Sequence, residues 1–349
     1  MSLLMHIIGG VPSGAPGLTA PVVDQVIQRN GSNKGTISVT GSTLFPFTSV
    51  QARAVAITGG TTTPWTQIYS KGAAAPGSFS GSLSNVDAGY YQFQVRTTYY
   101  GNPNGTKAIS AISIADIIIS AGQSLGANAL QTITKSTDPR AVAYGFASSA
   151  SGWPTAVGWV RQFGDPTPIA TEGNGNGSIW PTFADLVIAQ TGLPVAVLPL
   201  NVNGTLAAQW EPSGSSPNWY SLLQQAVQLF PANGFRCIIW DQGPADGAAG
   251  TSSAAYVASM EHIIDQSRTD AGWTIPWAIC KESNDPSGVP NTTIRSAQTT
   301  VQGYTGCFAG ADLDSLDGSY RFDGTHFNLA GQQASANLWF QALKTHFGW

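Results

Sequence analysis

Charged residues are scarce in this chain of 349 residues. Only 10% are Asp, Glu, Lys or Arg, against roughly 25% in typical soluble proteins. Ser, Thr, Asn, Gln and Gly must therefore solvate most of the surface, a pattern typical of extracellular or virion proteins. The net charge is −4 and there is no basic run, which argues against a nucleic-acid partner.

Cysteine is also rare. The chain has three, at Cys237, Cys280 and Cys307, with no CxxC motif. This set is neither a disulfide framework nor a metal cluster, so we predict no metal site and no cofactor. One pair could bridge in an oxidising compartment, and the sequence leaves this open.

Long hydrophobic runs are missing, so the sequence predicts no transmembrane helix and no membrane partner. The first residues, MSLLMHII, lack the basic region and long apolar core of a signal peptide. From composition we expect an extracellular or phage-associated (virion) protein. The eleven Trp and ten Tyr residues favour a neutral, carbohydrate-like ligand, although any single ring is expected to pack in the core or at its rim.

The N-terminal part has the pattern of an all-β domain. Segments 36–40 and 50–55 alternate in polarity, and 90–98 is rich in aromatic and β-branched residues. Turn signals such as Asn30-Gly31 separate them. We predict an irregular leader at 1–17 and a β-sandwich of immunoglobulin or fibronectin type at 18–114.

After residue 115 the pattern changes to short apolar runs without alternation, at 117–119, 195–198, 237–240 and 277–279. Strands buried on both faces of a parallel sheet have this pattern. Helices are expected between and after them, at 181–190, 219–230, 253–268 and 329–347. This alternation predicts a three-layer α/β/α domain over residues 115–349, with its ligand beyond the carboxyl ends of the strands.

A carboxylate and an imidazole stand three residues apart before the last helix, at Asp323 and His326. Far upstream, Ser124 lies between Gly122 and Gly126 at the end of a predicted strand. A hydroxyl is a weak nucleophile unless a base takes its proton, and a carboxylate fixes the tautomer of that base. We therefore predict Ser124 as nucleophile, His326 as general base and Asp323 as the group that orients it.

Two more blocks follow predicted strands. Gly204 follows the strand at 195–198, where a glycine lets a backbone N–H approach a reacting oxygen. Gln242 follows the strand at 237–240 and places an amide donor at the same edge. Asn328 is expected to cap the last helix.

In this order, the blocks resemble those of the SGNH (GDSL-type) hydrolase superfamily, especially sialate O-acetylesterases and related carbohydrate acetylesterases. The GQSN block of these enzymes is present as GQS at 122–124, and their GGT block as NGT at 203–205, before Trp210. Their WxQGExD block corresponds to residues 240–246, and DGxHF is intact at 323–327.

The resemblance covers roughly residues 115–345 and implies a flavodoxin-like sheet and acetyl-ester hydrolysis. It also implies that the backbone N–H groups of Ser124 and Gly204, with the Gln242 side chain, form an oxyanion hole.

Three positions depart from the family pattern: Leu125 replaces Asn, Asn203 replaces Gly and Pro244 replaces Glu. These changes remove polar groups expected near the substrate, so we predict a changed substrate rather than a lost activity.

The sequence thus predicts a serine esterase that removes acetyl or other short acyl groups from O-acetylated oligo- or polysaccharide. The alternative is a non-catalytic carbohydrate-binding or phage tail-associated module that retains an esterase shell. An α/β-hydrolase is disfavoured, because its acid normally lies well upstream of its histidine and its nucleophile follows several strands with crossover helices.

The remaining histidines are expected to have structural roles. His6 lies in the leader, His262 within a helix and His346 near the C-terminus.

The remaining acids near the motifs are also expected to be structural. Asp241 and Asp246 should support the loop around Gln242. Asp312, Asp314 and Asp317 should be solvated carboxylates, with a calcium site as the alternative. Arg321 should pair with one of these acids or reach the substrate.

Overall fold

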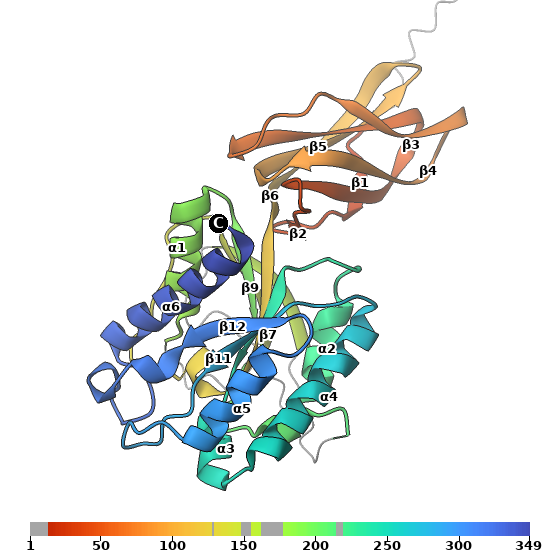
Figure 1. Cartoon of the computed structure of the whole chain (residues 1–349). Coiled ribbons are helices and arrows are strands. Elements are labelled where there is room, and N and C mark those ends of the chain that lie inside the picture. The colour runs from red at the N-terminus through yellow and green to blue at the C-terminus, as the bar shows by residue number, and fades with distance from the viewer. Residues whose placement is uncertain (1–12, 128, 148–154, 162–176, 214–218) are drawn as a thin grey trace, which may run out of the picture. The chain divides into compact units, whose positions relative to one another are not determined.

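The computed structural model describes residues 13–349 except 128, 148–154, 162–176 and 214–218. The chain divides into two compact units, Met1–Ile114 and Ala115–Trp349, coloured red to yellow and yellow to blue in Figure 1. Each unit is described by itself below. His6 lies outside the described residues.

The first unit is built from antiparallel strands. These are β1 (Gly17–Ala20), β2 (Val26–Gln28), β3 (Lys34–Thr58), β4 (Thr66–Asp87), β5 (Gly89–Tyr99) and the first part of β6 (Asn102–Gly122). The long strand β3 pairs with β1, β4 and β5, and β5 pairs with β6. Burial alternates along β5, where Tyr91, Phe93 and Val95 are fully buried. The segments predicted at 36–40, 50–55 and 90–98 are confirmed as strand, but the first two are parts of one strand, β3, rather than separate short strands.

The sheet of the second unit is centred on the last part of β6. Two strands flank it in parallel, β9 (Val195–Pro199) and β10 (Cys237–Asp241). Beyond β10 lie β11 (Trp277–Lys281) and β12 (Cys307–Asp312), both parallel. Beyond β9 lie β7 (Ala141–Ala147), parallel to it, and β8 (Thr155–Arg161), antiparallel to β7. The sheet is therefore mixed, and the four predicted strands form its parallel centre.

Six α-helices are described, and all lie in the second unit (Figure 1). They are α1 (Trp180–Thr191), α2 (Tyr220–Gln228), α3 (Pro244–Ala249), α4 (Ser253–Ala271), α5 (Thr292–Gln302) and α6 (Leu329–Phe347). Helix α1 packs against α6, and α4 packs against α2 and α5. The four predicted helices are confirmed, and the side chain of Asn328 caps α6 by accepting from Gly331 N, as expected.

The core of the second unit explains the unbroken apolar runs. Ile117, Ile118 and Ile119 are all fully buried. Because successive side chains of a strand point to opposite faces, both faces of β6 must be covered here. Five of the largest buried side chains are also in this unit, namely Trp180, Trp210, Trp240, Trp277 and Trp339.

The three cysteines are free thiols in this structure. Burial raises the pKa of each, to about 11 for Cys307. No helix among the described residues is long and apolar enough to cross a bilayer.

Candidate active site

Ser124 begins a short 3-10 helix, Ser124–Gly126, directly after β6. The turn that carries it needs glycine at position 122, where φ is +133° and an added Cβ would lie 2.1 Å from Asp241 O. Gly126 is equally constrained, since a Cβ there would lie 2.2 Å from Nδ2 of Asn201. The indole of Trp180 donates to Gly126 O at 2.7 Å. Close packing on both sides thus fixes the backbone around Ser124.

Gln123 fastens the Ser124 turn to the neighbouring strand. Its backbone N–H donates to Asp241 O at 2.7 Å. Its side-chain oxygen accepts from Gly243 N and Ala245 N, both at 3.2 Å. The side chain is 3% exposed, so it links the nucleophile turn to the start of α3.

His326 and Asp323 form a compact pair. Nδ1 of His326 lies 2.7 Å from Oδ2 of Asp323. Oδ1 of the same carboxylate accepts from His326 N at 2.6 Å and from Thr325 N at 2.9 Å. Partial burial alone would raise the pKa of Asp323, but these hydrogen bonds outweigh it and hold that pKa below its ordinary value. The carboxylate therefore orients both the imidazole and the turn that carries it.

The Asp323–His326 turn packs directly against the loop between β11 and α5. Gly324 has φ +85°, and a Cβ there would lie 2.1 Å from Pro286 O. Phe322, which is 43% exposed, stacks near the imidazole of His326 with ring centroids 6.1 Å apart. The backbone after the turn leads straight into α6 through the Asn328 cap.

The predicted oxyanion donors lie on two adjoining loops. Gly204 follows β9 and has φ +67°, with open space where a side chain would stand. Gln242 follows β10 and is fully buried. Its amide nitrogen donates to Thr205 O at 3.0 Å and to Oδ2 of Asp246 at 2.6 Å. In this structure Gln242 therefore ties down the turn that carries Gly204.

Asp246 and Trp210 also form hydrogen bonds with the loop that carries Gly204. Asp246 accepts from Ala207 N at 2.8 Å as well as from Gln242, so its expected loop-supporting role is confirmed. The indole of Trp210 donates to Oγ1 of Thr205 at 3.0 Å.

One cavity of about 600 Å³ brings the predicted residues together. Ser124, Gly204, Asp323 and His326 all line it, whereas Gln242 does not. The remaining lining residues are Gln123, Ala129, Asn203, Pro244, Ala245, Gly247, Ala248, Ser283, Asn284, Asp285, Pro286, Asn291, Phe322 and Thr325.

The three departures from the family pattern have different environments. Asn203 and Pro244 line the cavity. Leu125 is fully buried in the apolar core with Trp180 and Ile118, and it is not among the lining residues. The expectation that position 125 lies close to the substrate is therefore wrong for this side chain, because its apolar chain points into the core.

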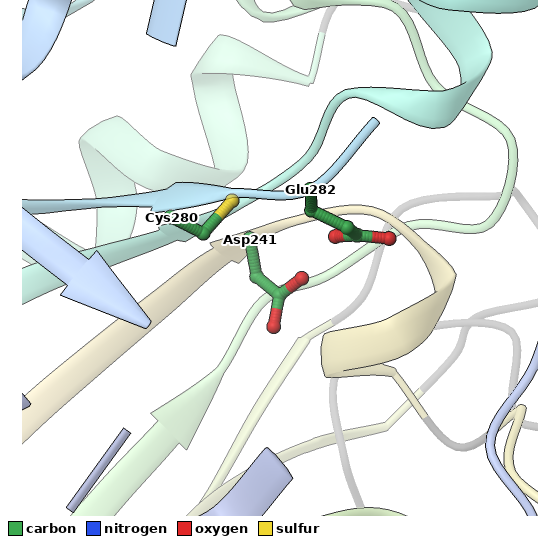
Figure 2. A group of neighbouring side chains, drawn as sticks. All are labelled: Asp241, Cys280 and Glu282. Atoms are coloured by element: carbon green, nitrogen blue, oxygen red, sulfur yellow. The ribbon is translucent and has the colours of Figure 1, made fainter. Parts of the chain in front are cut away.

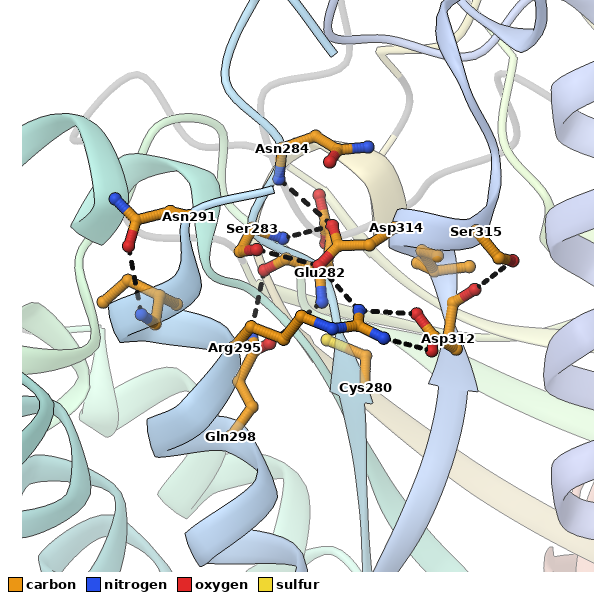
Figure 3. A network of polar contacts seen from close by, with 12 residues as sticks. Cys280, Glu282, Ser283, Asn284, Asn291, Arg295, Gln298, Asp312, Asp314 and Ser315 are labelled. Carbon is orange, nitrogen blue, oxygen red and sulfur yellow. Dashed lines mark hydrogen bonds and ion pairs between the residues drawn. The ribbon is translucent and has the colours of Figure 1, made fainter. Parts of the chain in front are cut away.

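Asp314 joins β12 to the β11–α5 loop that lines the cavity (Figure 3). Its side chain is 2% exposed and accepts from Ser283 N at 2.7 Å, Ser283 Oγ at 2.8 Å and Asn284 N at 3.1 Å. Arg295 on α5 donates to Asp314 at 2.9 Å and also pairs with Asp312 at 2.6 Å. The expectation of a solvated carboxylate is thus wrong for Asp314, which is buried and fully engaged.

A second buried group lies at the ends of β10 and β11. Asp241, Cys280 and Glu282 each place a donor atom within 4.8 Å of the others (Figure 2). Burial, together with the negative charge of Asp241, raises the pKa of Glu282 well above its ordinary value, and burial raises the pKa of Asp241. With a neutral thiol and the charge of Arg321 nearby, the group fits a proton shared between two carboxyls better than a bound cation.

Arg321 has a role that the sequence did not indicate. It is buried and donates to three backbone carbonyls, those of Leu313, Leu316 and Thr325, and it forms no ion pair with an acid among the described residues. Its guanidinium also lies 4.7 Å from the ring centroid of Phe327. It therefore braces the segment that contains Asp323 and His326 and is not among the cavity-lining residues.

The other candidates have structural roles. His262 pairs with Glu211 at 3.1 Å, and His346 stacks on Phe308 with centroids 3.5 Å apart. Asp317 caps a short turn by accepting from Ser319 N.

The positioning roles of Gln123 and Asp314, like that of Arg321, were not predicted from the sequence. Gln123 stands inside the GQS motif, so it carried a signal at the carboxyl end of a strand. Asp314 carried none, because its partners Ser283 and Arg295 are far from it in the sequence.

Comparison with known proteins places this geometry in context. Residues 116–344 match the family model described as "Carbohydrate esterase, sialic acid-specific acetylesterase". A search of curated proteins gave no match. The structure of a carbohydrate acetylesterase from Xanthomonas citri aligns with 95% of this chain and 74% of its own, at 16% identity and a TM-score of 0.57. A protein from Arabidopsis thaliana aligns with 67% of this chain and 99% of its own, at 15% identity and a TM-score of 0.49. The first of these shows a shared fold.

Proposed function

Because the chain belongs to the carbohydrate esterase, sialic acid-specific acetylesterase family, we propose that it removes acetyl groups from O-acetylated carbohydrate through a Ser-His-Asp acyl-enzyme mechanism. It is a carboxylic ester hydrolase of the SGNH type. The observation that carries the mechanism is the 2.7 Å pair of His326 and Asp323 on the same cavity as Ser124.

In the first step, Oγ of Ser124 attacks the carbonyl carbon of the acetyl ester and its proton passes to His326. Nδ1 of His326 is paired with Asp323, so Nε2 is the nitrogen available for that proton. Collapse of the tetrahedral intermediate expels the sugar oxygen, which takes the proton back from His326. Water then attacks the acetyl-enzyme by the same route and releases acetate.

The oxyanion of each intermediate is stabilised by the N–H groups of Ser124 and Gly204. Preorganised donors of this kind each contribute about 10²–10³ in rate. Gln242 is the third donor of the proposal. Its amide nitrogen donates to Thr205 and Asp246 in this structure. It therefore reaches the oxyanion when one of these hydrogen bonds breaks, and otherwise acts by holding the Gly204 turn.

The proposal extends to the domains. Residues 18–114 act as an accessory β-sandwich, and residues 115–349 as a flavodoxin-like three-layer catalytic domain. Antiparallel pairing with alternating burial supports the first assignment. Parallel pairing around a doubly buried β6 supports the second. Low charge supports an extracellular or virion-associated setting.

The central test is hydrolysis of p-nitrophenyl acetate by wild type and the Ser124→Ala variant. We expect kcat/KM to fall on the order of 10⁴-fold or more, because the nucleophile is lost. Ser296→Ala, an exposed serine on α5, is the matched control and should retain the wild-type rate. The wild-type rate should also rise with pH between about 5 and 8, since a histidine base must be neutral. Equal rates for wild type and Ser124→Ala would refute the mechanism and favour a non-catalytic module.

A further inference from the structure

The described lining of the active-site cavity carries no Lys or Arg. Its ionisable side chains are Asp285, Asp323 and His326. Hydrogen bonds hold the pKa of Asp323 below its ordinary value despite partial burial, so that carboxylate is charged at neutral pH. The lining therefore has an excess of negative charge.

Two of the cations that flank this lining in the sequence are committed elsewhere. Arg295 is paired with Asp312 and Asp314, and Arg321 is buried against backbone carbonyls. The segments outside the structural description (1–12, 128, 148–154, 162–176 and 214–218) contain no Lys or Arg in their sequence. The described lining thus offers no cationic side chain to a carboxylate on the substrate.

Asn284, in contrast to these charged groups, brings an uncharged polar side chain to the cavity. It lines the cavity and is 1% exposed, yet neither its amide nitrogen nor its amide oxygen has a hydrogen-bond partner among the described residues. Its backbone N–H is held by Asp314, and in Figure 3 its side-chain amide points away from that contact. A buried amide without partners is costly, so this group is poised for a ligand.

The hydrogen-bond donors and acceptors of this amide indicate the type of ligand. An amide offers both a donor and an acceptor, and a sugar hydroxyl can satisfy both, whereas a carboxylate accepts only. In the same cavity, Pro244, Ala245 and Phe322 give apolar surface for the C–H face of a sugar ring.

We propose that this cavity selects neutral acetylated sugars over anionic ones such as sialates, with Asn284 binding a hydroxyl of the sugar and Asp285 repelling a substrate carboxylate. The inference rests on the proposed esterase function and names its substrate class. Charge exclusion of this kind is a specificity device in its own right, because like charges brought together in a cleft oppose binding.

The first test compares 9-O-acetyl-N-acetylneuraminic acid with its methyl ester, which differ in one negative charge. At low salt we expect kcat/KM for the methyl ester to be about ten-fold higher, and the difference to shrink as salt screens the carboxylates. In Asp285→Asn the difference should fall about three-fold. That variant keeps the Oδ1 that accepts from Ser287 N and Val289 N. Equal or faster turnover of the free acid would overturn the inference.

The second test addresses Asn284 with 6-O-acetyl glucose and p-nitrophenyl acetate. Asn284→Ala should lower kcat/KM for the sugar about ten-fold more than for the aryl ester, because only the sugar brings hydroxyls to the amide. Asn284→Asp, of the same shape, should also fail to restore the sugar rate, since its carboxylate has no donor. An equal loss on both esters would remove Asn284 from sugar binding.

Failure of the inference and failure of the proposed function are distinguishable in these assays. If wild type hydrolyses p-nitrophenyl acetate through Ser124 but prefers the anionic sugar, the esterase function stands and the inference falls. If wild type hydrolyses none of the esters, both fall.

Discussion

At the scale of single residues, two of the positive-φ glycines of the site, Gly204 and Gly324, are constrained in different ways. Gly204 has φ +67° with open space around the missing Cβ, whereas Gly324 has φ +85° and no room, because Pro286 O lies 2.1 Å from where a Cβ would stand. The first glycine meets a purely conformational demand and the second also permits contact between two backbones.

This contrast gives a paired prediction. Gly204→Ala should cost about 1 kcal/mol of unfolding free energy, from the strained backbone alone. Gly324→Ala should cost about 3 kcal/mol or more, because Asp323 and His326 must shift with the backbone. Its kcat/KM should fall at least about 10²-fold, since misplaced catalytic groups are costly. Urea unfolding and p-nitrophenyl acetate kinetics measure both effects, and a larger loss in Gly204→Ala would contradict this account.

Residue by residue, motif spacing predicted the positions that share the cavity: Ser124, Gly204, Asp323 and His326. It did not predict that the amide of Gln242 is occupied by Thr205 and Asp246. A motif records which residue follows a strand, but the direction of a side chain depends on acceptors from another loop.

At the scale of elements, the β11–α5 loop owes its position to Asp314, a single buried carboxylate. It binds two backbone N–H groups and one hydroxyl of that loop and pairs with Arg295 on α5. The loop in turn lines the cavity and supports Gly324.

Removing this carboxylate should therefore loosen the loop. We expect Asp314→Ala to lower the unfolding free energy by about 3 kcal/mol or more, because buried donors and Arg295 lose their partner. Asp312→Ala is the matched control. It breaks another ion pair of Arg295, but Asp312 is 42% exposed, so about 1 kcal/mol or less should be lost. Chemical denaturation of both variants measures the two losses of unfolding free energy. Equal losses would show that the hydrogen bonds of Asp314 to the β11–α5 loop are not the source of stability.

Elements with strong apolar runs were predictable, and those without them were not. Strands β6, β9, β10 and β11 have unbroken apolar runs. In contrast, β12 reads CFAGAD and is only partly buried, so it carries no such signal. Helix α5 reads TTIRSAQTTVQ, and its threonines are poor helix formers that packing against α4 and β11 overrides.

At the scale of the whole molecule, the buried Asp241–Glu282 pair links folding to pH. Burial and the charge of Asp241 raise the pKa of Glu282 well above its ordinary value. An acid with a raised pKa in the folded state holds its proton there, while the unfolded chain has already released it. The folded state is then penalised as pH rises from the unfolded pKa of Glu toward the folded one.

We therefore expect the unfolding free energy of wild type to decrease as pH rises above the unfolded pKa of Glu, by up to roughly 1.4 kcal/mol per pH unit from this pair. Glu282→Gln, which keeps the shape but cannot ionise, should have a flatter profile. Glu261→Gln on α4 is the control for a simple loss of charge and should keep the wild-type slope. Identical slopes for wild type and Glu282→Gln would contradict a shared proton.

The indole of Trp339 donates to Oδ2 of Asp241 at 3.2 Å from within α6. This contact places a natural chromophore beside the shared proton. Because indole emission responds to nearby charge, the difference spectrum between wild type and Trp339→Phe, recorded across pH, would follow that proton optically in the folded, unlabelled molecule.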